Sequence, residues 1–198
     1  MMTVPSARLV GLHLVSRRVP ASLLALAVAA VALRAVLRWT PASGAHAVMF
    51  PLIVATAAAT AVSMTTHSPL GETERVTGRW LPWLRLGTVL AMVGGACGAL
   101  ALGAVGGHLA IGVPALLRDL AGLTGIALLT AALLGAGLSW TGPLTYLILS
   151  SFPVQRAWTT PWLWPARPAH DRAAAICAVL GFVAGVAAIT VLGDSKRS

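Results

Sequence analysis

Long uninterrupted runs of apolar residues dominate the pattern along the chain. Four runs contain no Asp, Glu, Lys or Arg, and these are 40–66, 86–117, 120–155 and 173–193. A fifth run begins at Val19 and extends to Trp39 if Arg34 carries its charge to the membrane surface. A bilayer core about 30 Å thick needs roughly 20 apolar residues per helix. Because backbone amides in lipid must bond internally, and the runs lack the period of two of barrel strands, they predict transmembrane helices.

Prolines and glycines divide these runs into elements. We expect about six transmembrane helices, at 19–39, 44–66, 83–105, 120–137, 139–152 and 172–193. A loop through Gly106, Gly107, His108 and Pro114 is expected to lead to Arg118 and the fourth helix. Gly135, Gly137 and Pro143 interrupt the longest run, so the predicted fifth helix is short. The predicted fold is an all-α polytopic membrane protein whose single transmembrane domain covers 1–198.

Three segments lie outside the predicted helices. Residues 1–18 are basic and weakly amphipathic, so they form either an interfacial helix leading into the first span or a flexible tail. Residues 153–171 combine tryptophans and prolines, which favours a broken segment at the membrane surface. Residues 67–80 form the most polar loop of the protein.

The 67–80 loop contains the pattern of a short surface helix. Ser68 followed by Pro69 is typical of an N-cap with proline at the first helical position. The acidic residues come first and the basic residues later, which is the order that the helix dipole favours. These residues are Glu72, Glu74, Arg75 and Arg79. Such a loop either connects two helices in solvent or docks a partner.

Composition and charge agree with a membrane protein. Of the 198 residues, 58% are hydrophobic and 10% charged, whereas about a quarter are charged in soluble domains. The net charge of +9 comes from arginines at the ends of the apolar runs, where they contact lipid head groups. The sequence has no basic stripe with interleaved aromatic residues, so we expect the lipid bilayer and not nucleic acid as the partner of this charge.

The basic residues also predict an orientation. With six spans, the side of the termini would hold eight positive charges: Arg8, Arg17, Arg18, Arg75, Arg79, Arg85, Lys196 and Arg197. The opposite side would hold six: Arg34, Arg38, Arg118, Arg156, Arg167 and Arg172. The positive-inside rule therefore predicts a multi-pass protein of the plasma (inner) membrane with both termini in the cytoplasm.

The sequence contains no recognisable catalytic or metal-binding motif. The five histidines lie in different loops and helix ends without the spacing H-E-x-x-H, and neither a G-x-S-x-G nor a Walker A motif is present. Cys97 and Cys177 lie in apolar runs, where Cys behaves as a small hydrophobe. Arg118-Asp119 could belong to an ion pathway, but its position at the predicted helix boundary favours a locally paired interfacial couple. We expect no cofactor, no metal and no enzymatic activity in this chain.

Small-residue spacings predict helix-packing faces. Glycines four residues apart allow two helix backbones to approach closely in a membrane. Three such pairs occur: Gly94 and Gly98, Gly103 and Gly107, and Gly181 and Gly185.

The chain resembles the membrane subunits of ABC transporters of the ABC-2 permease type, particularly the small Ala-, Leu- and Arg-rich subunits of actinobacteria. Such permeases carry an E-x-E-x-G-T-like run between helices two and three, and the corresponding stretch here is Gly71-Glu72-Thr73-Glu74-Arg75-Val76-Thr77-Gly78-Arg79. Gly78-Arg79 stands where Gly-Thr is more usual. The basic lead-in 1–18, the six apolar blocks and the broken 153–171 segment are also similar to parts of that family.

The resemblance implies a permease subunit, most often of an exporter, that dimerises and couples to a separate cytoplasmic ATPase. It implies that Glu72, Glu74, Arg75 and Arg79 contact this ATPase through a coupling helix. Six helices are too few to enclose a substrate path, so a second copy or a sister permease is expected. The alternatives are a membrane scaffold or assembly factor without transport, and a lipid-modifying membrane enzyme.

Overall fold

The described part of the chain is helical. The structure is a computed structural model that describes residues 19–39, 45–65, 81–151 and 162–191. Five helices in these ranges are long and apolar enough to cross a membrane: α2 (Val19–Trp39), α3 (Ala45–Met64), α5 (Leu81–Ala104), α6 (Gly112–Leu134) and α8 (Arg172–Val191). The shorter elements are η2 (Ala136–Leu138), α7 (Thr141–Ser151) and η4 (Trp164–Ala166). This is the architecture of a multi-pass membrane protein.

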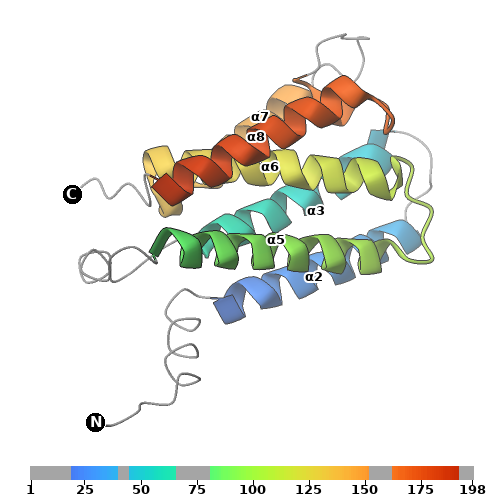
Figure 1. The fold of residues 1–198 in the computed structure, drawn as a ribbon. Helices are drawn as coiled ribbons and strands as arrows, with labels where there is room; N and C mark the ends of the chain where they lie inside the picture. Colours follow the sequence, from blue (N-terminus) through green and yellow to red (C-terminus); the bar gives the residue numbers. More distant parts are fainter. Residues whose placement is uncertain (1–18, 40–44, 66–80, 152–161, 192–198) are drawn as a thin grey trace.

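The first four long helices run alternately along one bundle, and α8 runs in the same direction as α6 (Figure 1). One end, which we call the Val19 end, holds the start of α2, the end of α3, the start of α5 and the ends of α6 and α8. The other end, which we call the Arg118 end, holds the end of α2 and the starts of α3, α6 and α8. The first described residue of α2 and the last of α8 therefore lie at the same end of the bundle.

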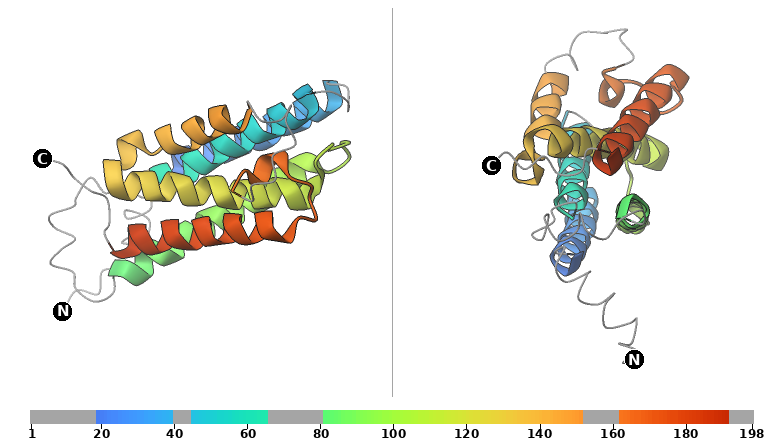
Figure 2. Two further views of the ribbon diagram at one scale, coloured as in Figure 1. Left: turned by 90° about the horizontal axis from the view of Figure 1, so that it is seen from above. Right: turned by 60° about the vertical axis from the view of Figure 1, so that its left-hand side comes forward.

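Helix α6 lies at the centre of the bundle. It packs against α8 on one side and α3 on the other, and α7 also contacts it (Figure 2). In the apolar stretch of α6, 67% of the residues are buried, whereas the share is 22% in α2 and 22% in α8. Fully buried leucines from three helices fill the interior around it, and these are Leu33, Leu100, Leu116, Leu120, Leu123 and Leu128. The outer helices instead expose large apolar side chains, as lipid-facing helices do.

The start of α6 differs from the sequence prediction. We expected a loop through Pro114 and a helix from Leu120, but the helix begins at Gly112 and includes Arg118. The prediction was wrong because the proline and the charged residues were interpreted as helix boundary signals. Proline is tolerated in the first turn of a helix, where its missing N–H has no intrahelical partner. Gly112 has a φ of 75°, a conformation that favours glycine, and it starts the helix directly after the loop.

The predicted fifth helix at 139–152 corresponds to α7, which covers Thr141–Ser151. Helix α7 has 11 residues, which corresponds to about 16 Å at 1.5 Å per residue and is about half of a bilayer core. Gly135, with a φ of 92°, ends α6, and η2 then leads into α7. The described residues therefore contain five long helices and one short α-helix, where about six spans were expected.

Hydroxyl groups inside the helices bond to their own helix. Thr56 donates to the carbonyl of Leu52 at 2.8 Å, and Thr124 donates to the carbonyl of Leu120 at 2.7 Å. Such bonds satisfy a buried hydroxyl without water. One hydroxyl contact joins distant segments, because Ser63 at the end of α3 donates to Ser139 at 2.9 Å.

Glycines bring α6 and α8 into backbone contact. A Cβ at Gly125 would collide with the carbonyl of Gly181, and one at Gly185 would collide with the carbonyl of Gly125. Gly103 makes a similar approach to α2, since a Cβ there would lie 2.7 Å from the carbonyl oxygen of Ala30. At Gly107 a Cβ would lie 2.8 Å from the Cβ of Leu37.

Three glycines of the predicted packing faces have open space where a Cβ would stand. A Cβ at Gly94 or Gly98 on α5 would meet nothing within 4 Å, and neither would one at Gly181. Of the predicted pairs, Gly103 in α5 and Gly107 in the loop after it make close contacts, and the backbone of Gly181 and Gly185 meets Gly125, which has no predicted partner four residues away.

We predict that Gly125→Ala destabilises the protein and Gly94→Ala does not. The new methyl group at 125 forces α6 and α8 apart, and overpacking of this kind costs about 1–3 kcal/mol. At 94 the methyl group meets open space and the substitution favours the helix. The measurement is thermal unfolding of both variants in detergent micelles, followed by circular dichroism. Equal unfolding midpoints would contradict the proposed close contact.

Candidate functional site

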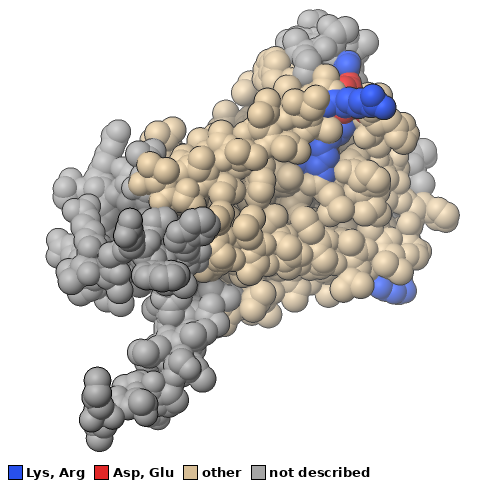
Figure 3. Space-filling model, viewed as in Figure 1, with Lys and Arg blue, Asp and Glu red and all other residues tan. Residues whose placement is uncertain are grey.

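The charged side chains whose placement is described gather at the Arg118 end. On the face shown in Figure 3, blue and red atoms lie at this end, and the remaining described surface is tan. Among them, Arg118 and Asp119 on α6 are buried, with 9% and 2% of each residue exposed. Their side chains form an ion pair in which the Nε of Arg118 lies 3.2 Å from Oδ1 of Asp119. Buried charges are expected to be paired and fully hydrogen-bonded.

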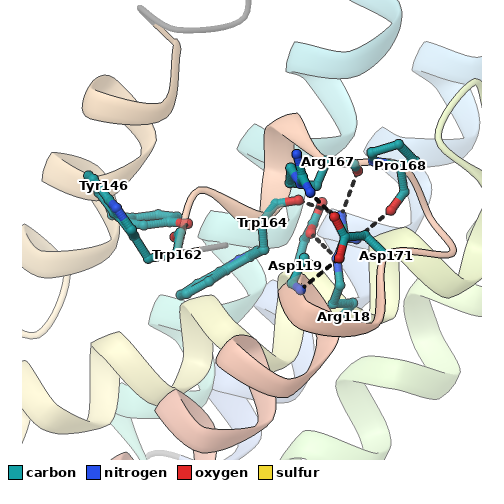
Figure 4. A network of polar contacts seen from close by, with 9 residues as sticks. Arg118, Asp119, Tyr146, Trp162, Trp164, Arg167, Pro168 and Asp171 are labelled. Carbon is teal, nitrogen blue, oxygen red and sulfur yellow. Dashed lines mark hydrogen bonds and ion pairs between the residues drawn. The ribbon is translucent and has the colours of Figure 1, made fainter. Parts of the chain in front are cut away.

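Arg118 also binds the backbone of the segment between α7 and α8. Its Nη2 donates to the carbonyls of Trp164, at 2.6 Å, and Arg167, at 3.2 Å. Its Nη1 donates to the carbonyl of Pro168 at 2.9 Å. Figure 4 shows these bonds converging on one guanidinium group. Arg118 thus ties this segment to α6 through three of its carbonyls, two of which also accept turn bonds from the N–H groups of Arg167 and Asp171.

Aromatic packing holds the same segment against α6. The rings of Trp164 and Tyr146 stack with centroids 4.6 Å apart, and the hydroxyl of Tyr146 donates to the carbonyl of Trp162 at 2.6 Å. The indole lies over Gly122, where a Cβ would stand 2.5 Å from Cζ2 of Trp164. The absence of a side chain at Gly122 therefore makes room for the indole. The buried Nε1 of Trp164 has no hydrogen-bond acceptor among the described residues.

Asp171 joins this segment to α8. Its Oδ1 accepts hydrogen bonds from the backbone N–H groups of Ala173, at 2.9 Å, and Ala174, at 3.2 Å. Its Oδ2 accepts a bond from Nε of Arg167 at 2.5 Å. The helical N–H of Ala174, together with the Arg167 guanidinium, holds the pKa of this carboxyl below its ordinary value. Asp171 is thus an N-cap of α8 that is itself oriented by Arg167.

The arrangement anchors a broken segment and carries no visible catalytic set. Three carbonyls, an ion pair and a stacked aromatic pair fix 162–171 on α6. Among the described residues, no group of three or more His, Cys, Asp or Glu could hold a metal ion. The chemistry of this site is therefore hydrogen bonding and positioning.

The other predicted residues fall into two groups. Glu72, Glu74, Arg75 and Arg79, with the segments 1–18 and 67–80, lie outside the described residues. The described histidines are exposed and belong to the Arg118 end, with His46 at the start of α3 and His108 and His170 in loops. The described cysteines are free thiols in α5 and α8.

Sequence reasoning found the Arg118–Asp119 pair but missed most of its surroundings. It interpreted the pair as an interfacial couple at a helix boundary, and the structure places it inside α6 and buried. The roles of Tyr146, Trp164 and Gly122 were not predicted. The available signal was an arginine in a long apolar helix, since such a charge requires buried partners.

Comparisons with known proteins give no assignment for this arrangement. No protein-family model, curated protein or solved structure matches the chain.

We predict that Arg118→Met strongly destabilises the protein. It leaves Asp119 without a partner and removes the donor to three carbonyls, and breaking a buried ion pair costs about 3–5 kcal/mol. The double variant Arg118→Met with Asp119→Leu should recover part of this loss, because the buried carboxylate is also removed. The exposed Arg34→Met is the control. Unfolding free energies in detergent micelles test this, and an Arg118 variant as stable as the Arg34 variant would refute the anchoring role.

We predict that Asp171 makes stability depend on acidic pH. Its pKa is lowered in the folded protein, whereas an unfolded aspartate titrates near about 3.9. Its contribution is therefore complete above the unfolded pKa and is lost as pH falls through the folded pKa. The unfolding midpoint should fall more steeply between about pH 5 and pH 3 in the native chain than in Asp171→Asn. Identical pH slopes would show that the cap does not contribute.

Proposed function

We propose that the chain is the membrane-spanning permease subunit of an ABC transporter of the ABC-2 type, an exporter coupled to a separate ATPase. One observation carries this proposal. Helix α3 ends and α5 begins at the Val19 end, where α2 also begins and α8 ends (Figure 1). The two helix ends joined by the connection that contains Glu72, Glu74, Arg75 and Arg79 therefore lie at the same end of the bundle as the first described residue of α2 and the last of α8. A coupling segment has to lie on the cytoplasmic side, together with the ATPase.

The charges support the cytoplasmic assignment of the Val19 end. The orientation rule counts basic residues that flank spans at the membrane surface. Of the six arginines assigned to the opposite side, Arg118 is buried within α6 and bonded to carbonyls. Arg167 is paired with Asp171. The Arg118 end therefore has fewer unpaired arginines at the membrane surface than the count of six indicates.

The packing supports a substrate path between subunits. Leucines and alanines with no exposed surface surround α6, including Leu120, Leu123 and Ala127, so the middle of the described bundle is filled. By contrast, α2, α5 and α8 keep apolar faces exposed, with Leu24 67%, Leu102 68% and Leu180 61% exposed. A second copy or a sister permease on such a face would provide the interface along which a substrate moves.

Reversal of charge in the coupling segment tests the proposal. Glu74→Arg combined with Arg75→Glu keeps the net charge and inverts the local pattern, so it should abolish co-purification of the ATPase from mild detergent. The matched control, Arg34→Glu with Arg38→Glu, changes exposed charges at the Arg118 end and should leave the ATPase bound. The measurement is mass spectrometry of the proteins that co-elute with the tagged chain.

Two results would count against the permease. Purification of the native chain without any ATPase would favour a membrane scaffold. Unchanged ATPase recovery with the reversed pair would remove Glu74 and Arg75 from the contact.

A further inference from the structure

A pocket opens at the Arg118 end beside the anchored segment. Its volume is about 590 Å³, within the range of small-molecule sites. The first turns of α6, the loop before it and residues 165–170 line it, together with Val48 of α3.

The lining combines apolar walls with cationic groups. Val48, Leu109 and Ile111 form apolar wall, and Arg118, Arg167 and His170 contribute polar nitrogen atoms. Arg118 has five N–H groups, of which its four hydrogen bonds use one on Nε, one on Nη1 and two on Nη2. One N–H on Nη1 of this buried side chain therefore has no partner among the described residues.

Arg167 has more free donors than Arg118. Only its Nε bonds, to Asp171, so both Nη groups have no acceptor among the described residues. Its side chain is 28% exposed, and His170 at the same rim is exposed and forms no hydrogen bond with another described residue. Donors that lie in a fork on arginine match the geometry of phosphate oxygens.

The negative charges near the pocket are already engaged. Asp119 is paired with Arg118, and Asp171 accepts bonds from Arg167 and from two backbone N–H groups of α8. Arg172 adds an exposed positive charge beside the rim. An anion at the mouth would therefore meet unused donors and a small excess of positive charge.

The depth of the pocket fits the region of lipid head groups. It lies where α6 and α8 begin, and at the same end of the bundle Trp39, which ends α2, is 87% exposed. Exposed tryptophan and arginine at the ends of spans are typical of the membrane–water interface.

We propose that this pocket binds the phosphate group of an anionic membrane lipid. Arg167 and His170 contact the phosphate, the remaining N–H of Arg118 faces it from the pocket wall, and Val48 and Ile111 pack against the glycerol and first acyl carbons. The site does not depend on the ATPase or on transport.

Native mass spectrometry of the full chain in a neutral maltoside detergent tests this site. The probes are phosphatidylglycerol, diacylglycerol with the same acyl chains, and inorganic phosphate. Phosphatidylglycerol should bind stoichiometrically and diacylglycerol should not. Arg167→Gln should weaken phosphatidylglycerol binding about tenfold, since it removes a charge-assisted hydrogen bond. Arg38→Gln, an exposed arginine at the same end that does not line the pocket, should leave binding unchanged.

A second variant distinguishes loss of the binding site from loss of the fold. His170→Gln leaves the ion pairs intact and should weaken binding by a smaller factor, with an unfolding midpoint equal to that of the native chain. Binding of inorganic phosphate with the same dependence on Arg167 would support the phosphate site and identify free phosphate as its source. Equal binding of diacylglycerol and phosphatidylglycerol, or binding that neither Arg167→Gln nor His170→Gln changes, would overturn the proposal. None of these results depends on whether an ATPase co-purifies.

Discussion

Backbone carbonyls that leave a helix within a membrane protein need hydrogen-bond donors, and this requirement shapes the Arg118 end of the bundle. Pro165 and Pro168 interrupt regular α-helix before α8. The carbonyls of Trp164 and Pro168 each accept one turn bond, from the N–H groups of Arg167 and Asp171 at 3.1 Å, and a carbonyl oxygen has a second lone pair for a further donor. Arg118 provides donors for the carbonyls of Trp164, Arg167 and Pro168 from one side chain. The carboxylate of Asp119 balances the positive charge of the buried Arg118 guanidinium. The cost of burying a guanidinium is thus offset by the polar groups it satisfies.

One face of α6 serves both the anchored segment and α8. Arg118, Gly122 and Gly125 stand at positions i, i+4 and i+7, which lie on the same side of a helix. The arginine binds the carbonyls, the first glycine makes room for Trp164, and the second contacts the backbone of α8. A larger side chain at Gly122 would push Trp164 and its segment away from α6, and one at Gly125 would push α8 away. The position of the segment and the close approach of α8 therefore both depend on small residues on one face of α6.

The sequence predicted the features that follow from the local pattern of apolar residues. Apolar runs longer than a bilayer is thick predicted the long helices, since their period and length exclude other spanning structures. The start of α6 could not be found this way, because Pro114 and Arg118 are compatible with either a loop or the first turns of a helix. The site depends on contacts such as Arg118 with Trp164, 46 residues apart, and a single sequence carries no signal for that pairing. Glycine spacing likewise predicted faces without partners, and it missed Gly125 because no glycine lies four residues from it.

The anchor also supports the position at which α8 begins. Helix α7 begins beside the end of α6, while α8 begins at the opposite end of the bundle (Figure 1). The chain between Thr141 and Arg172 must therefore travel the length of the bundle, although α7 covers only about half of a bilayer core. At the far end of this path, Arg118 bonds the residues that directly precede α8, and α8 itself packs along α6. The position at which α8 begins is therefore supported by a buried side chain of the helix on which α8 packs.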